Sequence, residues 1–277
     1  MSIINYKFFT APDQRRLRFR TILLLMERMS KNGIDIKFTI CDNICMNIAI
    51  YILSALTMVA GTATAVLYQT RRNVGALIAK MLAAVLFVIA GIIAFSVRSA
   101  SETMCALILA GLFPALGGDW FLAVKEIAPD EKRDYRNFAL GVICFGVAQI
   151  LYLLAFLADA EFRFLPAFIP LIVLPLLCTL ISLLTKQIHI EKKRLPFVVC
   201  YGLLLGTTLA MAASRYYLNP TTGGLIAMIG AAAFVLSDMS LACFFFADKI
   251  KDRRFFNFPV MILYFGAQVL YVLAMIF

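Results

Sequence analysis

LFPALGGDWFLAV, residues 112–124, holds a carboxylate, Asp119, in the middle of a long apolar segment. A second stretch, AAAFVLSDMSLAC at residues 231–243, does the same with Asp238. Burying an ionised carboxyl group in the hydrocarbon layer of a membrane is costly, so acidic residues are rare there and usually serve a function. The surroundings of the two aspartates therefore predict membrane-spanning helices, and the aspartates themselves are the first candidates for catalytic residues.

An internal repeat relates the two segments, because Asp119 and Asp238 are 119 residues apart and the same offset pairs identical residues elsewhere. These pairs are Gly111 with Gly230, Leu122 with Leu241, Ala123 with Ala242, Ala148-Gln149 with Ala267-Gln268, Leu151-Tyr152 with Leu270-Tyr271, and Leu154-Ala155 with Leu273-Ala274. The duplication predicts two equivalent halves, residues 44–158 and 163–277, that hold the two aspartates at similar depth. A paired polar site follows from this prediction.

Composition assigns the protein to the integral membrane class. The chain is 62% hydrophobic and 15% charged, with a mean hydropathy of +0.90, whereas soluble domains carry about 25% charged residues. The apolar segments are long enough to cross the hydrocarbon layer as helices, and they lack the short alternating pattern of a β-barrel. The net charge of +10 comes from short loops and the N-terminal region, which indicates membrane topology and a bilayer partner, not nucleic acid.

A basic N-terminal tail is predicted over residues 1–43, and a transmembrane domain over residues 44–277. The eight predicted spans are residues 44–68, 74–97, 102–124, 138–158, 165–186, 195–213, 222–246 and 257–277. Four spans per half is an even number, so both halves enter the membrane in the same direction and form a parallel repeat. The predicted fold is thus all-α, with eight transmembrane helices in two parallel four-helix repeats.

Basic residues in the loops predict the orientation. The loops after the first, third, fifth and seventh spans carry most of the loop lysines and arginines, and short basic loops face the cytoplasm. This places the aspartate-proximal loops on the cytoplasmic side. The basic tail then faces outward, against the same rule, so the loops and the tail favour opposite orientations.

Polar residues recur beside the aspartates in the last span of each half. Gln149 and Tyr152 share a helix face, and Gln268 and Tyr271 repeat the pair. Tyr264 lies one turn before Gln268 on the same face. These residues are candidate substrate-binding groups that surround the aspartates, although glutamine and tyrosine in membrane helices also bond neighbouring helices.

Lys80, inside the second span, and Ser237, beside Asp238, complete the candidate binding set. A lysine near a helix end extends to the lipid headgroups, or pairs with an aspartate or a lipid phosphate. His189 lies in the basic stretch QIHIEKKR and is expected to be solvated. No cysteine spacing, phosphate loop, nucleophile elbow or metal-ligand pattern is present, so the sequence predicts no metal and no cofactor.

The aspartate segments and the helices after them resemble the YhhN-like membrane family, the lysoplasmalogenases. The resemblance is carried by GLFPALGGDWFLAV at 111–124, FALGVICFGVAQILYLLAF at 138–156, GAAAFVLSDMSLACFFF at 230–246 and YFGAQVLYVLA at 264–274. Lys80 stands where the family often has a lysine followed by proline, but Met81 follows here. Gln149 stands where the family often has histidine, which puts in doubt any role that needs an ionisable group there.

This resemblance implies an eight-helix protein of the bacterial plasma membrane that hydrolyses the vinyl-ether bond of lysoplasmalogens. The expected products are a fatty aldehyde and a glycerophospho-headgroup, and the expected partner is a lysophospholipid substrate. Vinyl-ether hydrolysis starts with protonation of the alkene carbon remote from the ether oxygen, which gives an oxocarbenium ion. One carboxylic acid and one carboxylate suit this task, as in glycosidases, so Asp119 and Asp238 are the expected catalytic pair.

Two other classes remain open on the residues alone. A proton-coupled carrier or lipid-moving protein also uses acids inside parallel repeats. A non-catalytic lipid-binding protein is the other alternative, and it should tolerate neutral replacements of both aspartates. The oligomeric state, the headgroup preference and the identity of the general acid are not encoded in these patterns.

Overall fold

The computed structural model describes residues 36–125, 127, 131–158, 192–246 and 257–277, and every regular element in this part of the chain is an α-helix. The helices are α2 (Ile36–Gln69), α3 (Asn73–Ser96), α4 (Glu102–Lys125), α5 (Glu131–Leu157), α7 (Leu195–Leu218), α8 (Thr222–Phe246) and α9 (Asn257–Ala274). The predicted fifth span, residues 165–186, and most of the predicted tail lie outside the described residues. The prediction of eight helices in two superposable halves therefore stays a prediction.

All seven described helices are long and apolar enough to cross a membrane. Large apolar side chains remain exposed along them, such as Val59, Ile78 and Phe113, as expected where lipid replaces water. The protein is thus an all-α, multi-pass membrane protein. Three helices extend beyond their predicted spans: α2 begins at Ile36, inside the predicted tail, α5 begins at Glu131, and α7 ends at Leu218. Glutamate, lysine and arginine are good helix formers, so the charged residues extend helix α5 beyond its apolar part.

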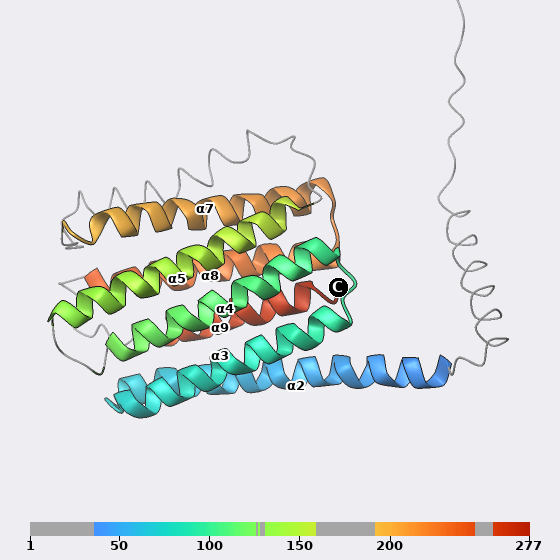
Figure 1. Ribbon diagram of the computed structural model, residues 1–277, viewed down its shortest axis with the longest axis horizontal. Helices are drawn as coiled ribbons and strands as arrows, with labels where there is room; N and C mark the ends of the chain where they lie inside the picture. The colour runs from blue at the N-terminus through green and yellow to red at the C-terminus, as the bar shows by residue number, and fades with distance from the viewer. Residues whose placement is uncertain (1–35, 126, 128–130, 159–191, 247–256) are drawn as a thin grey trace, which may run out of the picture. The chain divides into compact units, whose positions relative to one another are not determined.

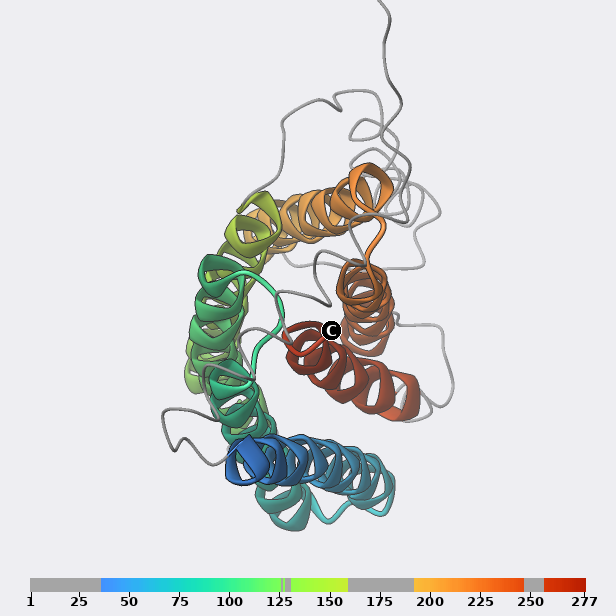
Figure 2. The same cartoon turned by 90° about the vertical axis from the view of Figure 1, so that its right-hand side faces the viewer.

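Residues Asn47–Phe277 form one compact unit. Within it, helices α3, α4, α5, α7, α8 and α9 pack in that order, and α9 returns to contact both α3 and α4. Figure 1 shows these helices side by side, and Figure 2 shows their order from the end. Helix α9 therefore brings the last part of the chain against the helix that carries Asp119.

The two aspartate helices pack against their successors in the same way. Gly111 of α4 faces the ring of Tyr152 on α5 so closely that an added Cβ would overlap it, and Gly230 of α8 faces Tyr271 of α9, where an added Cβ would lie 3.1 Å from the ring. A side chain at either glycine would push the tyrosine away. These close contacts fix where each tyrosine enters the core.

Polar contacts fasten the helix ends on both sides of the bundle. Arg194, just before α7, donates to Asp134 of α5 over 2.8 Å, and Lys125 at the end of α4 lies 3.7 Å from the same carboxylate. At the other end of α7, Arg215 donates to the backbone carbonyl of Ala158. These contacts hold α5 and α7 together at both ends.

Candidate functional site

Asp119 lies at the centre of a buried polar cluster. It is on α4, and it is fully buried. The ammonium of Lys80, on the neighbouring helix α3, is 3.1 Å from one carboxylate oxygen, and the hydroxyl of Tyr264, on α9, donates to the other over 2.6 Å. The lysine does not extend to the headgroups, since its side chain is only 6% exposed. Three helices thus converge on a single carboxyl group.

Asp238, on α8, is partly buried and has a different partner. The hydroxyl of Tyr201, on α7, donates to its carboxyl group over 2.5 Å. Helix α9 contacts both α4, which carries Asp119, and α8, which carries Asp238. The two repeat-related acids therefore lie on helices that pack against the same third helix.

The surroundings of the two aspartates are not equivalent. At the 119-residue offset, Tyr264 corresponds to Phe145, which has no hydroxyl. Phe145 of α5 packs edge-on against Phe234 of α8, with ring centres 6.4 Å apart, and Phe234 is one helical turn before Asp238. The ring of Phe145 thus reaches the side of α8 that carries Asp238 without offering it a hydrogen bond.

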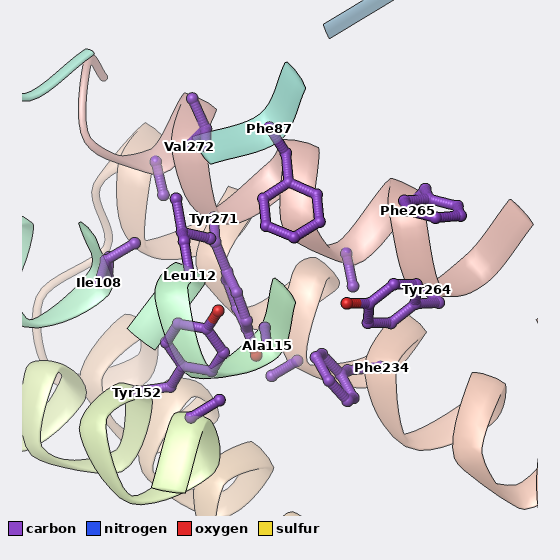
Figure 3. Packing of buried hydrophobic residues seen from close by; sticks show 14 of the residues in the cluster. Phe87, Ile108, Leu112, Ala115, Tyr152, Phe234, Tyr264, Phe265, Tyr271 and Val272 are labelled. Carbon is purple, nitrogen blue, oxygen red and sulfur yellow. The ribbon is translucent and has the colours of Figure 1, made fainter. Parts of the chain in front are cut away.

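The remaining glutamines and tyrosines form a buried group beside Asp119. Tyr152 donates to the side-chain carbonyl of Gln268 over 2.8 Å, and the rings of Tyr152 and Tyr271 lie 4.6 Å apart. Figure 3 shows Tyr152, Tyr264 and Tyr271 gathered with Phe234 in the same part of the core. Both polar atoms of the Gln149 side chain, the amide nitrogen of Gln268 and the Tyr271 hydroxyl have no protein partner among the described residues.

Unpartnered polar atoms at this burial carry a free-energy cost unless water or a ligand satisfies them. Gln149, Gln268 and Tyr271 are 1% exposed or less. Their unpartnered atoms are donors and acceptors that a water molecule or a small polar ligand could satisfy. The described residues leave this hydrogen-bonding capacity unused. The region next to the aspartates is therefore equipped to hold water or a polar part of a substrate.

Ser237 has a packing role that is visible in its contacts. Its hydroxyl donates to the backbone carbonyl of Val260 on α9 over 3.0 Å, which ties α8 to α9. His189 lies outside the described residues. Within the described part of the chain, no group of three or more His, Cys, Asp and Glu lies together in a way that suits a metal ion.

Sequence reasoning missed Tyr201. It does not take part in the repeat, since Leu82 stands at the corresponding position. A tyrosine near the end of a membrane helix is also typical of a residue at the lipid–water interface. Only the packing of α7 against α8 identifies Tyr201 as the partner of Asp238.

The comparisons with known proteins identify the family. The YhhN family model matches residues 75–275, which is most of the chain and includes both aspartates. No significant match was found among curated proteins or solved structures. Because the matched region spans well over half of the sequence, the chain belongs to the YhhN family.

Proposed function

We propose that this protein is a membrane-embedded hydrolase that cleaves the vinyl-ether bond of lysoplasmalogen-type lysophospholipids, with Asp119 and Asp238 as its acid–base pair. One observation carries the proposal: two carboxyl groups on different membrane helices each accept a hydrogen bond from a tyrosine hydroxyl of another helix. Membership in the YhhN family supports it, because the lysoplasmalogenase activity associated with this family requires acid chemistry.

The proposed reaction needs one protonated and one ionised carboxyl group. The protonated aspartate transfers its proton to the alkene carbon remote from the ether oxygen, and an oxocarbenium ion forms. The ionised aspartate offsets the new positive charge. Two carboxyl groups within range of each other in a medium of low dielectric constant share a proton near neutral pH, so the pair is suited to hold this combination.

Water completes the reaction. It attacks the carbon that bears the ether oxygen, and its proton returns to the aspartate that acted as the acid. The resulting hemiacetal collapses to a fatty aldehyde and a glycerophospho-headgroup, so one water is consumed and the enzyme is regenerated. The unpartnered polar atoms of Gln149, Gln268 and Tyr271 are proposed to hold this water or the glycerol hydroxyls.

The apolar surroundings suit the rest of such a substrate. A long alkenyl chain stays in the hydrocarbon layer, where large apolar side chains face it. The phosphate belongs at the membrane surface, where basic loops attract anionic headgroups. The vinyl ether is next to the glycerol and therefore lies just inside the membrane, and Asp119 lies less than two helical turns from the end of α4.

The test is aldehyde release from purified protein in detergent, given a lysoplasmalogen. The matched control substrate is the saturated 1-alkyl lysophospholipid, which lacks the alkene and should yield no product. A protein that leaves every lysoplasmalogen intact but moves it across proteoliposomes would contradict the hydrolase and favour the carrier. A protein that does neither, and keeps lipid binding after both aspartates are replaced by asparagine, would favour a lipid-binding role.

A further inference from the structure

The partners of the two aspartates differ in charge. The Lys80 ammonium lies 3.1 Å from Asp119, which also accepts a hydrogen bond from Tyr264. Asp238 has only the neutral phenol of Tyr201, at 2.5 Å. Among the residues that the structure describes, no cation lies within ion-pair distance of Asp238. A negative charge is therefore better supported on Asp119 than on Asp238.

The sequence carries the same asymmetry. At the 119-residue offset, Lys80 corresponds to Val199, and Tyr264 corresponds to Phe145. Both groups that stabilise an anion at Asp119 thus have apolar counterparts in the other half. Both halves of the repeat have an aspartate, but the side chains around the two aspartates differ. Such a difference is needed if one aspartate is protonated while the other is ionised.

We propose that Asp238 holds the proton that is delivered to the substrate, that Asp119 is the ionised member of the pair, and that Tyr201 positions the Asp238 carboxyl group. Two negative charges within range of each other repel in a medium of low dielectric constant. A single proton relieves this repulsion best on the carboxyl group that has no cation beside it. The delivery step rests on the proposed function, whereas the location of the proton does not.

The roles follow the movement of charge through the reaction. The O–H bond of Asp238 breaks as a C–H bond forms on the remote alkene carbon, and the ether oxygen supplies the electron pair that makes the oxocarbenium ion. Asp238 becomes a carboxylate, and Tyr201 already donates toward it, so the developing anion meets a positioned donor. Asp119 faces the oxocarbenium charge as a carboxylate throughout. Water then adds to the oxocarbenium carbon, and its proton restores Asp238.

Infrared spectroscopy tests the location of the proton without a substrate. A protonated carboxyl group gives a C=O stretching band, which a carboxylate lacks, and aspartate labelled with ¹³C identifies it. At neutral pH in detergent, the wild-type protein is expected to show such a band from a buried aspartate. Asp238→Asn should remove the band. The double variant Lys80→Met/Asp119→Asn should keep it, because it removes both neighbouring charges and a carboxyl group out of water with no cation beside it favours its neutral form. The absence of the band in the wild type, or its persistence in Asp238→Asn, would overturn the proposal.

One matched pair of variants and one single variant sharpen the test. Tyr201→Phe should shift the frequency of the band, because it removes the hydrogen bond to Asp238, while Tyr264→Phe removes an equivalent phenol from Asp119 and should leave the band in place. Lys80→Met should add a second protonated carboxyl group, since Asp119 then loses its cation. A band that moves with Tyr264→Phe but not with Tyr201→Phe would assign the proton to Asp119 instead.

Kinetics distinguish positioning by Tyr201 from a merely structural role. One hydrogen bond to a developing charge corresponds to about a 10- to 100-fold change in rate, so Tyr201→Phe should lower kcat by this factor with KM nearly unchanged. A Tyr201→Phe enzyme with full kcat would overturn the positioning role. If the wild type hydrolyses no lysoplasmalogen but the infrared bands behave as expected, the proposed function fails and the location of the proton stands.

Discussion

Replacing Asp119 with asparagine is expected to destabilise the protein far more than the same replacement at Asp238. The reason is Lys80, whose ammonium lies 3.1 Å from Asp119 with a side chain that is 6% exposed. At that distance, and with an effective dielectric constant of about 20, the attraction between the two charges is about 5 kcal/mol. Asp119→Asn removes this attraction and leaves the lysine buried without a counter-charge.

Breaking a buried ion pair on one side lowers the free energy of unfolding by about 3–5 kcal/mol. Asp238→Asn removes no ion pair, and the asparagine side-chain oxygen still accepts the hydrogen bond from Tyr201, so its cost is expected to be about 1 kcal/mol or less. The double variant Lys80→Met/Asp119→Asn removes both charges together. Its stability should return to within about 1 kcal/mol of the wild type, because replacing a whole buried pair with neutral groups is often neutral.

Equilibrium unfolding in mixed detergent micelles measures these differences, with the fluorescence of Trp120 as the probe. Trp120 is the single tryptophan of the sequence and follows Asp119 directly. The reasoning is refuted if Asp119→Asn and Asp238→Asn are equally stable. It is also refuted if adding Lys80→Met does not recover stability in the Asp119→Asn background.

Three further outcomes are expected. Gly111→Ala should lower the unfolding midpoint more than Gly230→Ala, because the added methyl would overlap the ring of Tyr152 at the first site and only press on Tyr271 at the second; equal midpoints would contradict the packing. Hydrolysis in D₂O should place one deuterium on the aldehyde carbon next to the carbonyl, which mass spectrometry detects, and an unlabelled aldehyde would exclude protonation of the alkene. His189→Ala should release aldehyde at the wild-type rate, since the sequence places this residue in a solvated loop, and a large loss in the same assay would give His189 a role.

The sequence was sufficient to predict the class of fold, and it singled out the two aspartates as candidates for the site. Hydropathy identifies long apolar helices because a membrane span has a minimum length, and a carboxylate such as Asp119 stands out in that background. Helix ends were harder. The start of α5 at Glu131 was missed because charged residues are typical of both loops and exposed helix ends.

Partners across the bundle depend on tertiary packing, which no local pattern records. The contact of Tyr264 with Asp119 requires α9 to return to α4, although the two residues are far apart in the sequence. The pairing of Tyr201 with Asp238 requires the register of α7 on α8. The repeat indicated that the aspartates belong together, but it concealed how their surroundings differ, since a repeat emphasises what the two halves share.

The rate of aldehyde release by Asp238→Asn tests the central claim most directly. It should be compared with the wild type and with Glu102→Gln, which removes an exposed carboxyl group from the opposite end of α4 and should keep the wild-type rate. Loss of a general acid typically slows a reaction by about 10²–10⁴-fold, and Asp238→Asn is expected to fall in that range while its unfolding midpoint stays near that of the wild type. Aldehyde release by Asp238→Asn at the full wild-type rate would contradict the account.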